Sequence, residues 1–187
     1  EVITVTPTVT KDEALELMQN QRIGKLPVLQ EDGSIYGLIT RKTLNREELH
    51  PKATKDAKGR LAVGAAVGVT GDYLTRVKYL VEAGVDVLVL DIAHGHSVMS
   101  VEAIKAIKSK WNIPVVAGNV ATAQGAQDLV AAGADGIKVG VGPGSICTTR
   151  IVTGHGVPQL TAILEVCEAV DVPVIADGGI RKSGDMV

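Results

Sequence analysis

The sequence predicts an α/β protein whose larger part is a partial parallel (β/α)8 barrel. From residue 61 onward, short apolar runs alternate with amphipathic stretches in the rhythm of repeated strand–loop–helix units. Two segments recur: 83–86 (Ala-Gly-Val-Asp) returns at 132–135, and 113–117 returns at 172–176. Phe is absent, and a core of Val, Ile, Leu and Ala is typical of a parallel sheet buried on both faces. An open doubly wound sheet is the alternative.

The elements of this larger part follow from the apolar periodicity. Gly84 and Gly133 lie where the C-terminus of a helix favours a left-handed residue, so each separates a helix from the next strand. Five strands are too few for a closed eight-stranded barrel. We expect strands at 62–67, 86–91, 113–118, 136–141 and 172–177, and helices near 72–82, 98–110, 122–132 and 159–169.

Residues 1–44 are predicted to form a small α/β module. Residues 2–5 alternate like a strand, and Thr10 with Glu13 forms a capping box before a helix. Two short apolar strands, at 26–29 and 35–39, flank an Asp-Gly turn, which predicts a hairpin. The apolar stripe of the helix is expected to be Ala14, Leu15, Leu17 and Met18.

A linker is predicted at 45–60, because this stretch is charged and contains Pro51 and Gly59 as breakers. The expected division is therefore 1–50 for the small module with its linker and 51–187 for the barrel part, incomplete at both ends. The chain also lacks a starting Met, and we expect it to be a fragment or a trimmed product.

Composition excludes several classes of protein. Hydrophobic residues make up 45% and charged residues 21%, which indicates a globular protein rather than a disordered one. The net charge of −2 provides no basic field for nucleic acid. No apolar run reaches the ~18 residues of a membrane span, and no signal peptide is recognised. Two cysteines without a paired framework favour a reducing cytoplasm.

Polar and glycine-rich segments follow the predicted strands. In a parallel barrel the active residues lie at the carboxyl ends of the strands, so these segments are expected to converge at one rim. They are 91–97 (with Asp91, His94 and His96), Asn119, 142–150 and 177–181. The Lys and Glu side chains on 76–82 and 102–110, including Lys105, Lys108 and Lys110, are expected to be solvated.

Cys147 is the most informative single position. It lies in a glycine-rich loop, and a thiol there is a candidate nucleophile if nearby dipoles or cations lower its pKa. The alternative is a small buried hydrophobic residue. Cys167 shares a helical stripe with Leu160, Ile163 and Leu164, so we expect it in the core.

The glycine clusters and the other polar residues indicate binding less specifically. Gly140, Gly142 and Gly144 with Ser145 can present amide N–H groups to a phosphate or carbonyl groups to a cation, although tight turns need Gly in any case. Asp177-Gly178-Gly179 offers a carboxylate for a ribose diol and amides for a phosphate, and Asp91 can bind a ligand hydroxyl. His94 and His96 lack a third metal ligand nearby, and we interpret them as ordinary loop residues.

The segment 142–150, Gly-Pro-Gly-Ser-Ile-Cys-Thr-Thr-Arg, resembles the active-site loop of the inosine-5′-monophosphate (IMP) dehydrogenase family, which guanosine monophosphate (GMP) reductase shares. The segments 55–57, 64–68, 91–97, 118–119 and 176–179 are similar in order and spacing. Residues 1–44 resemble the second of two CBS motifs that the dehydrogenase carries inserted in its barrel. Because the reductase usually lacks this insertion, the resemblance favours the dehydrogenase.

The resemblance implies NAD-dependent oxidation of IMP to xanthosine monophosphate, in guanine nucleotide biosynthesis. Cys147 would attack C2 of the purine, with Thr149 beside it, and water would hydrolyse the resulting thioimidate. It also implies a cytoplasmic homotetramer, and neither nucleic acid nor a membrane as partner. The implied binding residues are Ser145, Gly178 and Gly179 for phosphate, Asp177 and Asn119 for the rest of the nucleotide, Asp91, Ala93, Gly140 and Gly142 for NAD, and the carbonyls of Gly142, Gly144 and Cys147 for potassium.

Departures from the family pattern limit these implications. The preceding barrel strands, the last strand and the mobile flap are not found, so we expect the isolated chain to be inactive. Thr43 stands where the CBS motif often has an aspartate for nucleotide ribose. Three alternatives stay open: a GMP reductase using NADPH, a CBS-type regulatory fragment without catalysis, and an unrelated barrel that binds phosphosugars.

Overall fold

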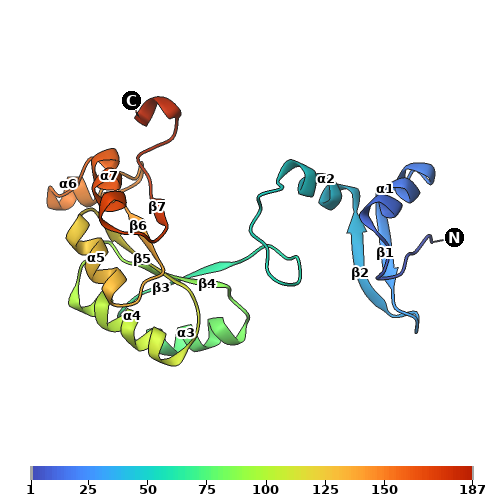
Figure 1. Ribbon diagram of the computed structural model, residues 1–187, viewed down its shortest axis with the longest axis horizontal. Coiled ribbons are helices and arrows are strands. Elements are labelled where there is room, and N and C mark those ends of the chain that lie inside the picture. Colours follow the sequence, from blue (N-terminus) through green and yellow to red (C-terminus); the bar gives the residue numbers. More distant parts are fainter. Residues whose placement is uncertain (1, 187) are drawn as a thin grey trace. The chain divides into compact units, whose positions relative to one another are not determined.

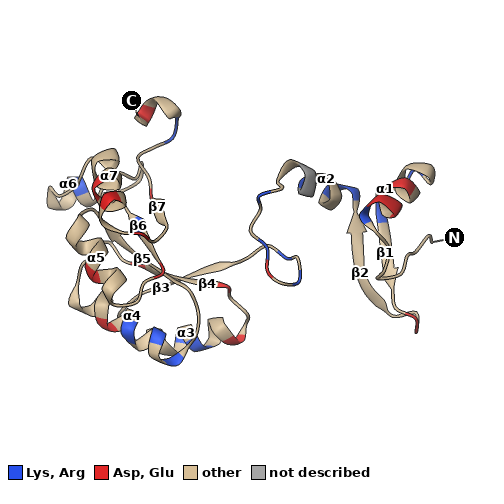
Figure 2. Ribbon diagram, in the orientation of Figure 1, with Lys and Arg blue, Asp and Glu red and all other residues tan. Residues whose placement is uncertain are grey.

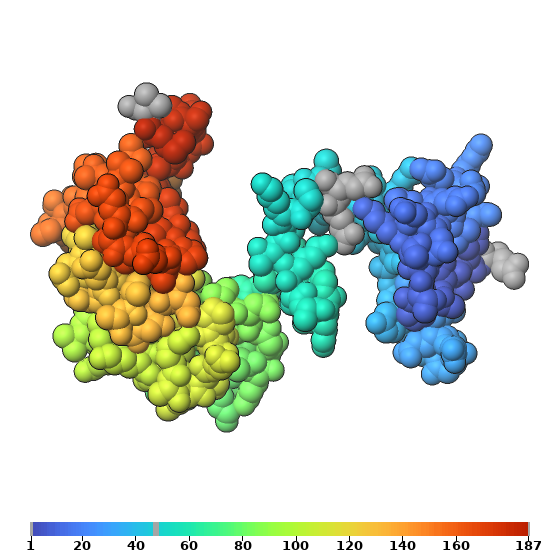
Figure 3. Space-filling view, in the orientation of Figure 1, coloured from blue at the N-terminus to red at the C-terminus, as the bar shows by residue number. Residues whose placement is uncertain are grey.

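The structure of the protein is a computed structural model that describes residues 2–186, apart from the side chains of residues 47 and 48. The chain divides into two compact units, Glu1–Leu61 and Ala62–Val187. The second unit is the green-to-red body in the space-filling view (Figure 3). Each unit has its own core, so each is described by itself.

The first unit is the small α/β module (Figure 1). The capping box at helix α1 (Lys11–Asn20) is confirmed, with the Glu13 carboxylate accepting the Thr10 N–H. Strands β1 (Lys25–Leu29) and β2 (Ile35–Thr40) form the predicted antiparallel hairpin. Helix α2 (Arg41–Leu49) follows directly. The buried core of the unit consists of Ala14, Met18, Leu26 and Leu44.

Two predictions for the first unit were wrong. Residues 2–5 form no strand of their own; Val5 makes a single parallel bridge with Val28. The predicted linker begins too early, because 45–49 belong to α2, whose N-cap Thr40 accepts the Thr43 N–H. The rest of that stretch belongs to the same compact unit, where Asp56 binds the Arg60 side chain at 2.7 Å.

The second unit is built around one parallel sheet, whose strands lie in the order β3-β4-β5-β6-β7. Neighbouring strands are also neighbours in the sequence, as in a barrel, whereas a doubly wound sheet reverses its order at a switch point. The strands are β3 (Gly64–Val67), β4 (Val87–Asp91), β5 (Val115–Val120), β6 (Gly136–Val139) and β7 (Val174–Ala176). The predicted barrel-type α/β architecture of this part is thus confirmed.

Helices connect the strands and line the outer side of the curved sheet (Figure 1). They are α3 (Tyr73–Glu82), α4 (Val98–Lys110), α5 (Ala123–Ala131) and α7 (Gln159–Ala169). Lys and Arg residues lie along α3 and α4 (Figure 2). Gly84 and Gly133 have φ of 84° and 110°, which confirms the predicted left-handed residues after α3 and α5.

Strand alternation separates a helix-covered face of the sheet from the barrel-interior face. Leu88 and Leu90 of β4, and Ile137 and Val139 of β6, are buried beneath the helices. Successive side chains of a strand point to opposite faces. Asp91 and Lys138 therefore lie on the interior face, at the carboxyl ends of β4 and β6.

The structure also differs from prediction in the second unit. The loop after β6 contains a short helix, α6 (Thr149–Thr153), and a 3-10 turn, η1 (Ser183–Met186), follows β7. The core placement of Cys167 was wrong, because Cys167 is exposed. The buried face of α7 consists of Gln159, Ala162 and Val166, which turns Leu164 and Cys167 outward.

No helix in the described part of the chain combines the length and the apolar character needed to cross a bilayer.

Candidate functional site

Polar side chains from four strands meet at the carboxyl-terminal edge of the sheet. Asp91 ends β4, Asn119 lies in β5, and Asp177 follows β7. The Asn119 amide donates to Oδ2 of Asp177 at 2.9 Å and to the Gly140 carbonyl at 2.8 Å. The structure therefore brings these three sequence-predicted residues together, with Gly140 beside them.

Lys138, which the sequence analysis missed, lies at the centre of this group. Its Nζ donates to Oδ1 of Asp91 at 2.8 Å, to Oδ2 of Asp177 at 2.6 Å, and to Oδ1 of Asn119. The signal was available, because a lysine between Ile137 and Val139 of an apolar strand needs charged partners.

These pairings set the charge states of the cluster. Burial alone would lower the pKa of Lys138, but the hydrogen bonds that it donates to Asp177 and Asp91 outweigh burial and raise the pKa. The bond from Lys138, together with that from Asn119, lowers the pKa of Asp177. The Lys138 ammonium is thus hydrogen-bonded between the Asp91 and Asp177 side chains.

Cys147 lies on the loop that follows β6. Its Sγ lies 3.3 Å from Oγ1 of Thr149, the first residue of α6. The Thr149 hydroxyl is the main cause of a lowered pKa of the Cys147 thiol, followed by backbone amides and the charge of Arg150. The structure thus supplies the thiolate-stabilising surroundings that a nucleophilic cysteine needs.

The loop containing Cys147 packs closely against the turn after β7. A Cβ at Gly178 would lie 3.0 Å from Cα of Gly144, and a Cβ at Gly179 would lie 3.0 Å from Cβ of Pro143. Both Gly178 and Gly179 also have positive φ, of 78° and 81°. Larger residues would therefore separate the two segments, which the sequence analysis had assigned to one phosphate site.

Gln159 is a second residue that the sequence analysis missed. Its side-chain amide is buried and donates to the carbonyls of Val139 at 2.8 Å and Asp177 at 3.3 Å. It therefore ties the carboxyl end of β6 to that of β7. The sequence carries little sign of this role, because a glutamine after a proline is common at the start of a helix. Only the packing shows that Gln159 is buried and joins two strands.

Two further predicted residues line a cavity of about 770 Å³. Ala93 and Thr149 both line it, as do His94 and His155. Ser145 is exposed on the loop. The cavity is large enough for part of a dinucleotide.

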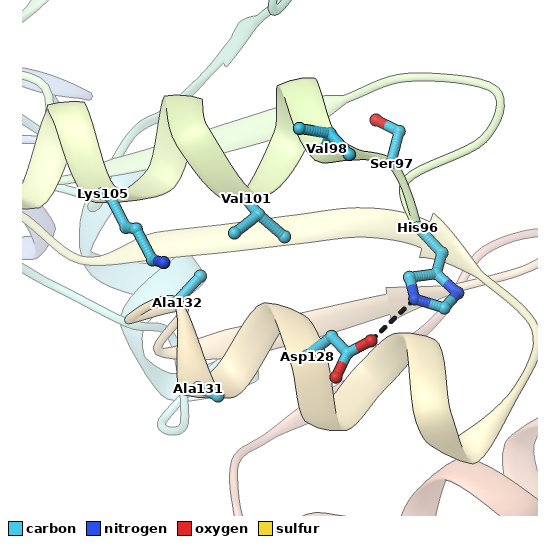
Figure 4. Close-up of a pocket in the computed structure, with 8 residues that line it drawn as sticks. All are labelled: His96, Ser97, Val98, Val101, Lys105, Asp128, Ala131 and Ala132. Atoms are coloured by element: carbon cyan, nitrogen blue, oxygen red, sulfur yellow. Dashed lines mark hydrogen bonds and ion pairs between the residues drawn. The ribbon is translucent and has the colours of Figure 1, made fainter.

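His96 lines this cavity and also pairs with helix α5 on the outer side of the sheet. Its Nε2 lies 2.8 Å from Oδ2 of Asp128 on α5, in a groove between α4 and α5 (Figure 4). The bond from His96 is the largest cause of the lowered pKa of Asp128. Within residues 2–186 as described, no three His, Cys, Asp or Glu side chains gather as metal ligands would.

The resemblance assigns the implied potassium ion to backbone carbonyls of the Cys147 loop. Gly142 in this loop has a positive φ of 83°. The Gly144 carbonyl accepts the Cys147 N–H at 3.0 Å and has a second lone pair for a cation. These hard oxygen donors fit a monovalent cation in chemistry, with further ligands required to complete its shell.

Comparisons with known proteins show which family the chain resembles. Residues 4–187 match the family model described as the IMP dehydrogenase / GMP reductase domain. The chain is 55% identical to an inosine-5′-monophosphate dehydrogenase of Aquifex aeolicus, over 100% of this chain and 39% of that relative. It is 51% identical to the one of Nitrosopumilus maritimus, over 99% and 40%. The chain thus spans about two fifths of these relatives.

Solved structures of a GMP reductase are also similar. The C318A variant from Trypanosoma brucei matches with a TM-score of 0.83 and 43% identity, over 100% of this chain and 43% of that chain. Its complex with guanosine 5′-monophosphate matches with a TM-score of 0.79 at the same identity, over 100% and 40%. A reductase matching the whole chain means that residues 1–61 do not separate the two activities, contrary to the sequence argument.

Proposed function

The chain belongs to the IMP dehydrogenase / GMP reductase family, and from this premise we propose that it carries the nucleotide-oxidising site of an IMP dehydrogenase. The proposed reaction converts IMP, NAD⁺ and water into xanthosine monophosphate, NADH and a proton. One observation carries the proposal: Cys147 is paired with Thr149 on the β6 loop, at the edge of the sheet where two carboxylates converge.

Cys147 acts as the nucleophile in this proposal. Its thiolate would add to C2 of the purine, and loss of the C2 hydride to a bound acceptor would leave a thioimidate on the sulfur. Water then adds at C2, and the Cys147 sulfur leaves as that carbon gains the oxygen of the product. The Thr149 hydroxyl supports both steps, because it can donate to the sulfur whenever the sulfur is anionic.

The neighbouring segments would hold the nucleotide. Oδ2 of Asp177 accepts bonds from Lys138 and Asn119, so Oδ1 would be the oxygen that binds a ribose diol. The amides of Gly178 and Gly179, with the exposed Ser145, would bind the phosphate. In this proposal the phosphate would lie beside the β7 turn and the Cys147 loop, which pack closely against each other.

The NAD⁺ side would be formed by Asp91 and the adjoining cavity. Asp91 would bind the nicotinamide ribose through the oxygen that Lys138 leaves free, with Ala93, Gly140 and Gly142 nearby. Bound NAD⁺ supplies a hydride acceptor. The protein's own contribution is to hold the acceptor ring against the purine and to keep Cys147 ionised.

Potassium would be held by the carbonyls of Gly142, Gly144 and Cys147. Its chemistry there is to fix the loop by coordination, which orients Cys147. The loop itself contributes the Gly144–Cys147 turn and the packing of Arg150 against Gly142, where a Cβ would lie 2.8 Å from Cγ of Arg150.

GMP reductase is the second candidate, supported by the similarity to the Trypanosoma brucei structures. The same cysteine would add to C2 of GMP, ammonia would leave, and NADPH would return a hydride to C2. The groups at Cys147, Thr149 and Asp177 suit both reactions. The relatives with the higher identity, at 51–55%, are dehydrogenases, which is why we favour oxidation.

For residues 1–50 we propose a CBS motif with a regulatory role. The support is the α1–β1–β2–α2 order, together with the Thr40–Thr43 pair that starts α2. A GMP reductase of Trypanosoma brucei solved with guanosine 5′-triphosphate matches the chain at a TM-score of 0.78 and 44% identity, over 100% of this chain and 45% of that chain. A guanine nucleotide is therefore the first ligand to test on this unit.

Alkylation of the two cysteines tests the proposed function directly. With iodoacetamide and peptide mapping, we expect Cys147 to react faster than the exposed Cys167, and IMP to protect only Cys147. Cys167 is a matched internal control because no proposed ligand contacts it. Equal reactivity of both cysteines, unaffected by IMP or GMP, would contradict both candidate reactions.

The reaction itself is distinguished by the coenzyme. We expect IMP with NAD⁺ to give a single burst of NADH and a nucleotide-sized mass increase on Cys147, without steady turnover by the isolated chain. Oxidation of NADPH with GMP, without NADH formation from IMP, would overturn the dehydrogenase in favour of the reductase.

A further inference from the structure

Lys138 is a largely buried lysine for which the neighbouring strand leaves space. It lies on the interior face of β6, opposite the buried Ile137 and Val139, and only 13% of its side chain is exposed. Gly118 pairs with it on β5, where a Cβ would lie 2.8 Å from Cβ of Lys138 and 2.4 Å from its carbonyl oxygen. The neighbouring strand therefore makes room for this lysine by lacking a side chain.

All three protons of the Lys138 ammonium are used. They are donated to Asp91 on β4, Asn119 on β5 and Asp177 after β7, so one side chain joins three strands besides its own. A ligand cannot gain a hydrogen bond from this Nζ without displacing one of these partners. The group is thus arranged to hold side chains rather than to bind a ligand itself.

The two carboxylates depend on the same cation. Each gives one oxygen to Lys138, and both oxygens lie within 2.8 Å of one Nζ, so the two negative charges lie close together. Without the ammonium they would repel each other, and Asn119 would lose the bond that orients its amide.

We propose that Lys138 is a positioning residue that couples the two ribose-binding carboxylates, Asp177 on the nucleotide side and Asp91 on the dinucleotide side. This inference rests on the proposed function, which assigns one ligand to each carboxylate. Because one ammonium orients both carboxylates, its loss lowers the affinity for both ligands. A change at either carboxylate likewise alters ligand binding at the other.

Lys108, in the last turn of helix α4, provides a matched control at the other edge of the sheet. Its Nζ pairs with Oδ2 of Asp135 at 2.9 Å and with the Ile113 carbonyl at 3.3 Å, at the amino-terminal edge. Lys108→Met therefore also removes a lysine–aspartate pair, but far from the proposed ligands. It is expected to leave the affinities for IMP and NAD⁺ unchanged.

The experiment compares Lys138→Met with Lys108→Met in the full chain, by calorimetric titration of IMP alone and of NAD⁺ alone. For Lys138→Met we expect each affinity to fall by about tenfold or more, since charge-assisted hydrogen bonds orient both carboxylates. Lys138→Arg keeps the charge and two or more donors, and is expected to recover most of both losses. If Lys138 served folding alone, restoring its positive charge in Lys138→Arg would not recover the affinities for both IMP and NAD⁺.

The carboxylate variants test the coupling without changing the lysine. Asp91→Asn is expected to change the affinity for IMP, which Asp91 does not contact, by about threefold or more. This variant stays informative if Lys138→Met fails to fold. Lys138→Met that weakens only one ligand, or Asp91→Asn without effect on IMP, overturns the coupling while the proposed function stands. A wild-type chain that binds neither ligand overturns both.

Discussion

The two edges of the parallel sheet use the same residue types in different ways. At the amino-terminal edge, Oδ2 of Asp86 accepts the Val63 N–H at 2.8 Å, and Oδ2 of Asp135 accepts the Val115 N–H at 2.8 Å. At the carboxyl-terminal edge, Asp91 and Asp177 instead bind the Lys138 side chain. Backbone partners fix strands, whereas a shared side-chain partner holds carboxylates ready for ligands.

The repeated segments at 83–86 and 132–135 acquire their meaning from this comparison. In each, glycine ends a helix in the left-handed region, and the aspartate two residues later binds the start of the preceding strand. The repeat therefore stabilises the amino-terminal edge of the sheet. In (β/α)8 barrels this edge generally contributes to stability, and the opposite edge carries the active site.

The largest expected effect is at the carboxyl-terminal edge and concerns activity alone. Cys147→Ser should lower the turnover of an active preparation by about a thousandfold or more, because the nucleophile is removed. The melting temperature should stay within error, since Cys147 is a half-buried loop residue. Cys167→Ser is the control and should keep full activity; a similar loss there would contradict the assignment.

Gly118→Ala should affect both stability and ligand binding. The new Cβ would lie 2.4 Å from the Lys138 carbonyl oxygen, which is backbone and cannot move freely. We expect destabilisation of about 1–3 kcal/mol from overpacking, and weaker IMP binding because Lys138 shifts. Denaturant unfolding and IMP titration measure the two effects. Gly184→Ala, with no atom within 4 Å of its Cβ, is the control.

Asp135→Ala should affect stability alone, at the amino-terminal edge. It removes bonds to the Lys108 side chain and the Val115 N–H, so we expect a loss of about 1–2 kcal/mol. Nucleotide affinity should not change. A large loss of IMP affinity in this folded variant would show that the two edges are not as separate as the structure indicates.

The smallest effect concerns the pH dependence of stability. Burial raises the pKa of Asp135, but the bonds from Lys108 and the Val115 N–H outweigh it, and the net pKa is lowered from 3.8. A depressed folded-state pKa gives stability that is present above the unfolded value and is lost as pH falls through the folded one. Below pH 3.8 the melting temperature of Asp135→Asn should therefore fall less steeply than that of the wild type.

Much of the fold was predictable because strands and helices leave local signals. The capping box of Thr10 and Glu13, the hairpin at 26–39 and the left-handed Gly84 and Gly133 depend on neighbours within a few residues, and all are confirmed. The exposure of Cys167 was missed because helical spacing defines a stripe, but the packing of α7 decides which stripe is buried.

For the candidate site, the sequence by itself determined which polar residues follow which strands, because the carboxyl ends of parallel strands share one edge. That is how Asp91, Asn119 and Asp177 were grouped before any distance was known. Only the tertiary structure placed Lys138 among them, since its partners lie 19 or more positions away and depend on the register that sets Gly118 opposite it. Local periodicity carries no information about register between strands, so the central cation of the site came from the assembled sheet.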